Sequence, residues 1–296
     1  PVSEPTVVEA SIPSTVETPI LPPMPDPTQE TKPDPETKPQ PKKELDGYLV
    51  LPDVMQAKNL FKLIGVLLVE PNFKMTPQAL TLRGMDPSRV AMMDLVIPRE
   101  NMTEYQCPED MTFCFSVERF LEKTLKNVTK NEGIRLDIHD GVSSKMNTRL
   151  LGKLTRNFSM PLLEPTEETV PTPKLIFNYT AKLVLENVNK IFKDLKDHVQ
   201  IIGTQDSLTF EEIGDIENFT VKLEKGDETV LSIEAKEDSK AKYSVPYINE
   251  FLKELASLTD IIEVSYSTDT PMRISADIEH LGTITFYLAP RIESDD

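Results

Sequence analysis

The segment at residues 285–294 reads TFYLAPRIES, and it joins a strand pattern to an abrupt stop. Aromatic residues such as Phe286 and Tyr287 favour strands. Pro290 has no amide proton to donate to a sheet, so the strand is expected to end just before it. The chain should therefore leave the sheet as an exposed apolar step beside Tyr287 and continue into an acidic end.

Upstream of this segment, the hydrophobic pattern from Tyr48 onward occurs twice, with a constant offset of 128 residues. The offset places Ser116 on Ser244, and serine is a good N-cap for a helix. An offset held along most of each copy indicates two domains of one fold. Other matched positions are Leu80 with Leu208, Leu82 with Phe210, Leu136 with Val264, Ile138 with Tyr266, and Phe158 with Phe286.

Each copy reads as a strand, a helix, several strands, a second helix and several more strands. Helices are expected at residues 54–68, 116–130, 181–197 and 245–258, from apolar stripes and N-cap residues. The sequence therefore predicts an α+β fold of two similar domains, each an antiparallel sheet with two helices. Their expected bounds are residues 47–160 and 174–296, with a proline-rich connector at 161–173.

Residues 1–46 contain 12 of the 25 prolines, with nine acidic residues and four lysines. This composition cannot bury a core, so a disordered, polyproline-like tail is expected. A partner-binding motif around residues 12–24 is the alternative role for this tail. Because residue 1 is proline rather than methionine, a segment before it is expected to be missing.

The 296 residues carry a formal charge of −17, and 39% are hydrophobic, enough for one large domain or two of ordinary size. A chain this acidic is not expected to coat nucleic acid by bulk charge. Cys107 and Cys114 are the only cysteines, which is typical of reduced intracellular thiols. No apolar run approaches the roughly 20 residues of a membrane span, and no signal-peptide pattern is visible.

No enzyme signature appears in the sequence. It lacks a phosphate-binding glycine loop, the GxSxG and HExxH motifs, and a metal-spaced cysteine–histidine cluster. His139, His198 and His280 are scattered along the chain. We therefore expect no catalytic residue, no cofactor and no metal site. An orphan enzyme on a duplicated α+β scaffold is the alternative, which a cleft lined by converging carboxylates or histidines would favour.

Three motifs give the chain a family resemblance. LAPRIE at residues 288–293 resembles the C-terminus of the sliding clamp PCNA, and LRGMDPSRVA at 82–91 resembles the Met-Asp strand-turn-strand of that family. DTPM at 269–272 is similar to its Asp-x-Pro-Leu turn. Together with the duplicated domains, the resemblance covers about residues 47–293, and it is nearest in flavour to archaeal members.

In the PCNA family, three two-domain subunits close into a ring around duplex DNA, with sheets outside and helices lining the hole. The resemblance implies a trimeric DNA clamp without enzyme activity, a processivity factor for replication and repair. Its implied partners are DNA polymerase, clamp loader, nuclease and ligase, which dock short apolar peptides. The implied location is intracellular: the cytoplasm or nucleoid of an archaeon, or the nucleus of a eukaryote.

The helices expected to line the hole carry lysines although the whole chain is acidic. Lys58 and Lys62 are four residues apart, as are Lys126 and Lys130, so each pair should share a helix face. A ring is held on DNA by topology, so weak contacts suffice and sliding stays easy. The lysines expected to face DNA are Lys58, Lys62, Lys123, Lys126, Lys130, Lys182, Lys190, Lys193 and Lys253.

The resemblance also assigns the two protein-binding surfaces. The partner-peptide pocket is expected at Met85, Arg89, Val90, Leu162, Leu163, Pro271, Tyr287, Ala289, Pro290 and Ile292. Arg89 departs from the shorter polar residue of the family pattern and would suit acidic peptides. Strand edges at 153–162 and 215–224, of opposite charge tendency, are expected to pair between subunits through Lys153, Arg156, Phe158, Phe219, Val221 and Leu223.

Two alternatives stay within this fold. One is a subunit of a heterotrimeric or checkpoint-type clamp, because the sequence does not show whether the neighbour is an identical chain or a paralogue. The other is a clamp whose tail tethers it to a further domain. A sizing and light-scattering measurement on the pure chain separates a homotrimer from the first alternative.

Overall fold

A computed structural model describes residues 45–292, apart from 142–143, 168–169 and 215–216. The tail predicted for residues 1–46 lies outside the described residues up to residue 44. Leu45 and Asp46 belong to the first strand instead, so the prediction placed the start of the fold two residues late. Within the described part of the chain, no helix combines the length and the apolar character that a membrane crossing requires.

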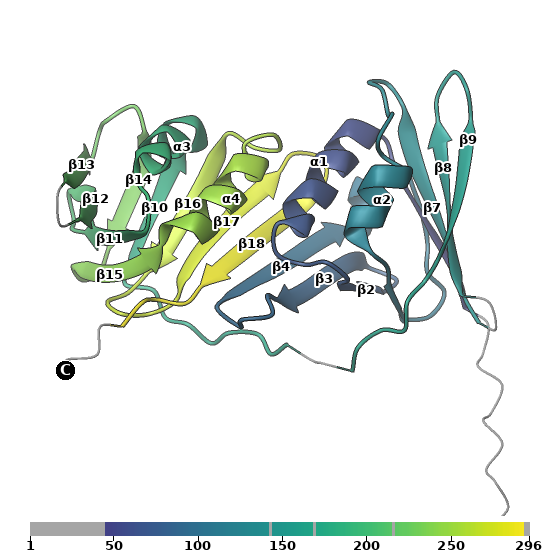
Figure 1. Cartoon of the computed structure of the whole chain (residues 1–296), viewed down its shortest axis with the longest axis horizontal. Helices are drawn as coiled ribbons and strands as arrows, with labels where there is room; N and C mark the ends of the chain where they lie inside the picture. The colour runs from purple at the N-terminus through teal and green to yellow at the C-terminus, as the bar shows by residue number, and fades with distance from the viewer. Residues whose placement is uncertain (1–44, 142–143, 168–169, 215–216, 293–296) are drawn as a thin grey trace, which may run out of the picture. The chain divides into compact units, whose positions relative to one another are not determined.

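The first half of the fold runs from Leu45 to Pro161 (Figure 1). Ser116 accepts a hydrogen bond from the Arg119 amide and caps the second helix, as its position predicted. The elements are β1 Leu45–Leu51, α1 Val54–Gly65, β2 Asn72–Met75, β3 Ala79–Met85, β4 Ala91–Pro98, the 3₁₀ turn η1 Arg99–Asn101, β5 Glu104–Gln106, β6 Met111–Cys114, α2 Val117–Lys123, β7 Gly133–Asp140, β8 Lys145–Leu151 and β9 Arg156–Pro161.

The second half repeats this order from Tyr179 to Leu288, without the 3₁₀ turn. The predicted duplication is confirmed, because the offset of 128 puts Ser116 and Ser244 at the two helix starts and Phe158 and Phe286 on β9 and β18. The elements are β10 Tyr179–Val184, α3 Leu185–Asp194, β11 His198–Gly203, β12 Ser207–Ile213, β13 Asn218–Glu224, β14 Val230–Ala235, β15 Ser239–Ser244, α4 Val245–Leu255, β16 Ile261–Tyr266, β17 Met272–Ile278 and β18 Gly282–Leu288.

One nine-stranded sheet joins the two halves, in the order β14-β10-β16-β17-β18-β4-β3-β2-β6. Its central pairing is antiparallel between β18 and β4, with Phe286 opposite Met93 and Leu288 opposite Ala91. A five-stranded sheet, β5-β1-β7-β8-β9, completes the first half, and a four-stranded sheet, β13-β12-β11-β15, completes the second. Two strands that the sequence predicted as open edges, β9 and β13, are each the last strand of their sheet.

The four α-helices of the described residues lie on one side of the sheets, and α1 contacts both α2 and α4 (Figure 1). The apolar stripe predicted for the first helix is buried, with Leu63 and Ile64 fully covered. Within the second half, Phe251 of α4 stacks on Phe286 of the junction strand β18, with ring centroids 4.4 Å apart. The helices therefore seal a core that runs continuously from one half to the other.

All four α-helices of the described residues are shorter than predicted. α2 ends at Lys123 rather than at residue 130, because Leu125 is buried in the core and the Arg156 guanidinium bonds the Asn127 carbonyl at 2.7 Å, fixing the segment as a loop. α3 begins at Leu185 rather than at residue 181, because residues 181–183 pair with strands on both sides, and Val184 pairs with β16, as part of β10. α1 and α4 end three residues early, at Gly65 and Leu255.

Candidate functional site

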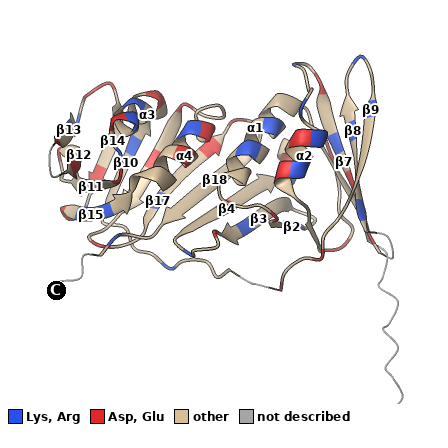
Figure 2. Cartoon of the chain, viewed as in Figure 1, with Lys and Arg blue, Asp and Glu red and all other residues tan. Residues whose placement is uncertain are grey.

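The helix side of the molecule is close to neutral, although the chain carries a charge of −17 (Figure 2). The four helices together carry seven basic and six acidic residues. α1 has Lys58 and Lys62 and no acid, whereas α4 has Lys253 between Glu250 and Glu254. The predicted lysine enrichment is therefore real only for α1, and the other helices mix both signs.

Three of the predicted DNA-facing lysines do not lie on helices. Lys126 and Lys130 belong to the loop after α2, so they do not share a helix face as predicted. The loop still approaches α1, because the Lys58 ammonium donates to the Lys126 carbonyl at 3.2 Å. Lys182 lies on β10 between the buried residues Ala181 and Leu183, so its side chain points to the sheet face away from the helices.

Lys190 and Lys193 lie on α3, and Lys123 is the last residue of α2. Each is exposed. Lys190 pairs with Glu186 one turn earlier, at 2.8 Å, and this exposed pair draws the pKa of Glu186 below its ordinary value. These side chains remain available to solvent on the helix side, but part of their charge is balanced locally.

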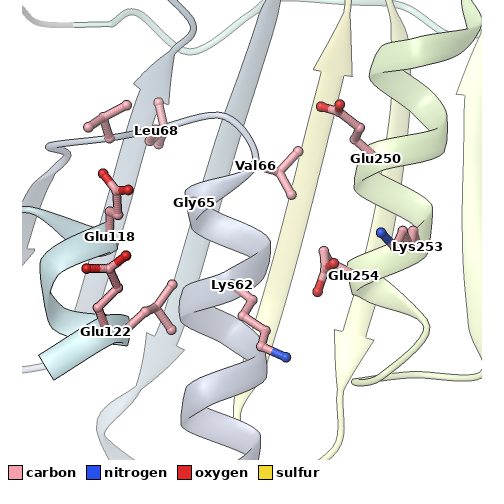
Figure 3. A pocket seen from close by; sticks show the side chains of 11 residues that line it. Lys62, Gly65, Val66, Leu68, Glu118, Glu122, Glu250, Lys253 and Glu254 are labelled. Atoms are coloured by element: carbon pink, nitrogen blue, oxygen red, sulfur yellow. The ribbon is translucent and has the colours of Figure 1, made fainter. Parts of the chain in front are cut away.

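A hollow of about 700 Å³ lies between α1, α2 and α4 on the same side (Figure 3). Lys62 of α1 stands between two pairs of glutamates, each pair one helical turn apart. Glu118 and Glu122 come from α2, and Glu250 and Glu254 come from α4. With four glutamates against Lys62 and Lys253, the lining of this hollow is acidic and disfavours close approach of a polyanion.

The loop between β3 and β4 is closed around one carboxylate. The Asp86 side chain is 6% exposed and accepts hydrogen bonds from the Val90 amide at 2.8 Å and the Ala91 amide at 2.7 Å. It also accepts from the Ser88 hydroxyl and from the Tyr247 hydroxyl of α4, the latter at 3.0 Å. Burial raises the pKa of Asp86, but these hydrogen bonds outweigh burial and hold the pKa below its ordinary value.

The tip of this loop has an uncommon backbone. Arg89 has φ of 59°, in the left-handed region that a non-glycine residue adopts at a cost of about 1 kcal/mol or more. The amide of Arg89 bonds the Asp86 carbonyl at 2.9 Å, which keeps the turn tight. The loop therefore has one defined shape, with Arg89 exposed and Val90 half-buried beside it.

The structure brings most of the predicted peptide pocket together around this loop. The register places Met85 opposite Met92, and Met92 opposite Tyr287, so all three lie on the sheet face away from the helices. Beyond the strand, the Ala289 amide donates to the Val90 carbonyl at 2.9 Å. Pro271 immediately precedes β17, whose first residue pairs with Leu288, and Pro290 and the exposed Ile292 continue from Ala289.

Two connector residues were assigned to this pocket wrongly. The Leu163 amide donates to the Cys114 carbonyl at 2.8 Å, and Cys114 is on β6. β6 is four strands away from β18, which is roughly 19 Å at about 4.8 Å per strand. Leu162, bonded to the Ser144 carbonyl, lies at the same remote end.

A later part of the connector crosses nearer the pocket. The Arg83 guanidinium on β3 donates to the Thr172 hydroxyl at 2.5 Å, and Asn72 on β2 bonds the Thr166 carbonyl at 2.8 Å. The connector is therefore fastened successively to β6, β2 and β3. Position in the sequence alone could not show which connector residue reaches Arg83 on β3.

In both edge strands, β9 and β13, partly buried apolar residues alternate with exposed residues. On β9, Phe158 and Met160 pack partly against the core, and on β13, Phe219 and Val221 do the same. The predicted charge contrast is largely satisfied within the chain, because Arg156 bonds Glu132 at 2.7 Å and Lys222 bonds Glu224 at 2.9 Å. Lys153 lies in the turn before β9, and Leu223 is buried.

No group of three or more histidine, cysteine, aspartate or glutamate side chains is placed to hold a metal ion among the residues described. Cys107 and Cys114 are both buried, and burial raises the pKa of each thiol. A thiol that stays protonated is a poor nucleophile, so neither cysteine has the surroundings of a reactive one.

Comparisons with known proteins match both halves. The family model described as proliferating cell nuclear antigen, N-terminal domain, matches residues 52–149, and the corresponding C-terminal domain model matches residues 173–291. A DNA polymerase sliding clamp of Nitrosopumilus maritimus is 31% identical over 242 residues, covering 80% of this chain and 95% of that protein. DNA polymerase sliding clamp 1 of Pyrobaculum aerophilum is 30% identical over 233 residues, covering 78% and 92%.

Solved structures show the same fold. The PCNA of Thermococcus kodakaraensis superimposes with a TM-score of 0.77 at 23% identity, covering 83% of this chain and all of that one. A complex of two PCNA proteins of Sulfolobus tokodaii gives a TM-score of 0.75, also at 23% identity and with the same coverage.

Proposed function

This chain belongs to the proliferating cell nuclear antigen family, and from that membership we propose that it is a DNA polymerase sliding clamp, a non-catalytic ring that holds polymerase on duplex DNA. The observation that carries the proposal is the arrangement of β9 and β13. They are open edges of separate sheets, one in each half, while all four helices cover one side. Copies joined edge to edge would keep their helices on one common side.

Pairing β9 of one copy with β13 of the next explains why both edges carry partly exposed apolar residues. If Phe158 lies opposite Val221, the antiparallel register places Met160 opposite Phe219 and Asn157 opposite Lys222. No like charges meet in this register. The edges are therefore complementary within one chain, which favours a ring of identical subunits.

A heterotrimer is the second candidate for the assembly. It is favoured by the fold match to a solved complex of two PCNA proteins. Light scattering on the purified chain separates the two: a homotrimer gives three times the chain mass of 33.4 kDa, and a heterotrimer subunit alone gives a smaller species.

The DNA surface of the ring is proposed on the helix side. Lys58 and Lys62 on α1 form its centre, supported by Lys126 and Lys130 in the loop beside α1 and by Lys123, Lys190, Lys193 and Lys253 on the other helices. Lys182 is excluded because it lies on the opposite face. A nearly neutral lining makes few phosphate contacts, so a ring closed around DNA would slide with little friction.

Partner docking is proposed at the surface made by Met85, Val90, Tyr287, Ala289 and Pro290, which is called the docking surface below. Its mixture of methionine, proline and tyrosine suits short apolar peptides of several sequences. Arg89 adds a positive rim. DNA polymerase, clamp loader, nuclease and ligase are the proposed partners, inside the cell where DNA is copied and repaired.

Retention by topology is the direct test of this function. The pure protein is allowed to thread onto linear duplex DNA with biotinylated ends, and streptavidin then blocks the ends. A sliding clamp is expected to survive a high-salt wash on the blocked DNA and to be lost when a restriction enzyme cuts it. Release by the wash whether or not the ends are blocked would show that the protein does not encircle DNA.

A further inference from the structure

The docking surface and the helix side meet at one side chain. Tyr247 lies on α4 in the second half, and its hydroxyl reaches across the junction to the loop between β3 and β4 in the first half. It donates to Oδ2 of Asp86 at 3.0 Å and lies 2.9 Å from Oγ of Ser88. The rest of the ring packs against the core.

Asp86 is the residue through which this contact can act. The same carboxylate that accepts from Tyr247 also holds the amides of Val90 and Ala91, and Val90 belongs to the docking surface. A buried carboxylate needs all its hydrogen-bond donors, since an unmet acceptor in this position is destabilising. Loss of the Tyr247 hydroxyl, which bonds Oδ2, is therefore expected to weaken the hydrogen bonds that the Val90 and Ala91 amides donate to Oδ1.

The loop has little rigidity of its own to replace that contact. Arg89 is held in the left-handed region, which is unfavourable for an arginine unless neighbouring contacts impose it. The contacts that impose this conformation are the hydrogen bonds to the Asp86 carboxylate and the hydrogen bond from the Ala289 amide to the Val90 carbonyl. Two of the three parts that shape the loop, α4 and the segment after β18, thus come from the second half.

We propose that Tyr247 is a positioning residue for partner docking: by bonding Asp86 and Ser88 it fixes the shape of the loop 86–90, so that docking strength depends on how α4 is seated against the first half. The inference rests on the proposed docking surface. It adds a link between the two sides of the subunit, because α4 also lines the helix side beside the acidic hollow.

The test removes the hydroxyl alone, in the Tyr247→Phe variant of the full chain. Tyr105→Phe is the matched control, because it also removes a hydrogen-bonded tyrosine hydroxyl, one that donates to the carbonyls of Thr76 and Ala79 in a different part of the first half. Two quantities are measured for each: amide hydrogen exchange at Val90 and Ala91, and affinity for a fluorescein-labelled synthetic peptide ending in two phenylalanines. Light scattering and thermal unfolding report whether each variant keeps its assembly and fold.

Tyr247→Phe is expected to speed exchange at Val90 and Ala91 by about fivefold or more and to weaken peptide binding by a similar factor, as for the loss of one hydrogen bond to a charged group. Tyr105→Phe is expected to lower the melting temperature without changing either quantity. Ser88→Ala should reproduce the effect in part, and the double variant should add less than the sum of the two.

Unchanged hydrogen exchange at Val90 and Ala91 in Tyr247→Phe would overturn the inference, whether or not the affinity for the peptide changes. Equal weakening of peptide binding in both tyrosine variants would also overturn it, because the effect would then be general loss of stability. If the unmodified protein does not bind the peptide, the proposed docking surface is wrong. The exchange rates at Val90 and Ala91 then still decide whether Tyr247 positions the loop.

Discussion

Arg83 on β3 holds both its cross-strand neighbour and the connector: Nε donates to Oδ2 of Asp94 at 3.1 Å, and Nη1 donates to the Thr172 hydroxyl at 2.5 Å. Asp94 is directly opposite Arg83 in the register of β3 and β4. The carboxylate thus orients a guanidinium whose remaining donor fastens the connector over the sheet. The connector is held near the docking surface by one side chain.

Replacing this anchor should release the connector. In Arg83→Ala, cleavage by a glutamate-specific protease at Glu167 is expected to be about fivefold faster, as for one lost hydrogen bond. Lys74→Ala removes a comparable exposed ion pair with Asp110 at 3.1 Å and should leave the cleavage rate unchanged. Equal cleavage rates in the two variants would rule out Arg83 as the anchor.

The edge strands should decide assembly. Phe158→Asp places a charge on the apolar face of β9 and is expected to give monomers by light scattering at micromolar concentration, because it would sit against Val221 of the next copy. Asn157→Asp on the other face of the same strand would lie opposite Lys222 and should keep or strengthen the assembly. A Phe158→Asp protein of unchanged mass would show that β9 is not the contact.

Charge in the hollow between the helices should tune DNA binding. The double variant Glu250→Gln and Glu254→Gln is expected to bind a short duplex about two- to fivefold more tightly at low salt, with the gain lost near 0.5 M salt. Glu234→Gln with Asp277→Asn removes the same charge from the opposite sheet face and should have no effect. An equal gain from both doubles would mean that only total charge matters.

Acid should loosen the loop around Asp86. Its pKa is lowered in the folded protein relative to about 3.9 in an unfolded chain, so its contribution to stability is complete above about pH 3.9 and is lost as the pH falls through the folded value. Asp86→Asn should lower the free energy of unfolding by about 1–3 kcal/mol at pH 7 and flatten its decline below pH 4. Urea unfolding between pH 7 and pH 2.5 measures both, with the exposed Asp206→Asn expected to behave like the unmodified protein.

The junction between the halves should tolerate no side chain at Gly282. A Cβ there would lie 2.1 Å from the Val96 carbonyl oxygen, so β18 would have to move away from β4. Gly282→Ala is expected to destabilise the chain by a few kcal/mol in thermal unfolding. Gly65→Ala, at the end of α1 with its nearest neighbour at 3.5 Å, should instead stabilise it by up to about 1 kcal/mol. A similar result for both variants would contradict this account of the junction.

Local rules predicted where α1, α2 and α4 begin, but not where α3 begins or where any of the four ends. The serine at 116 satisfies the first amides of α2 within a few residues, so the start can be read from the sequence. The apolar stripe continues to Val128, which made a longer helix reasonable. The helix ends early because Arg156, far along the chain, takes the Asn127 carbonyl, and no local pattern contains that contact.

The site predictions divide along the same line. Met85, Val90, Tyr287 and Ala289 come together because adjacent strands carry them in register, which the paired motifs already suggested. Lys182 was misplaced because residues 181–184 fit a helical stripe, and only pairing with β14 and β16 makes them a strand. Tyr247 gave no signal, because a tyrosine near a helix start is equally consistent with a purely packing role.

The pairing of β4 with β18 also sets the order in which this chain can be finished during synthesis. β4 ends at Pro98, whereas β18 begins at Gly282, so one edge of β4 stays unpaired in a growing polypeptide until almost all described residues have left the ribosome. A nascent chain stalled before β18 would present that strand to any other chain nearby. Truncated products should therefore aggregate or be degraded rather than persist as half-length clamps.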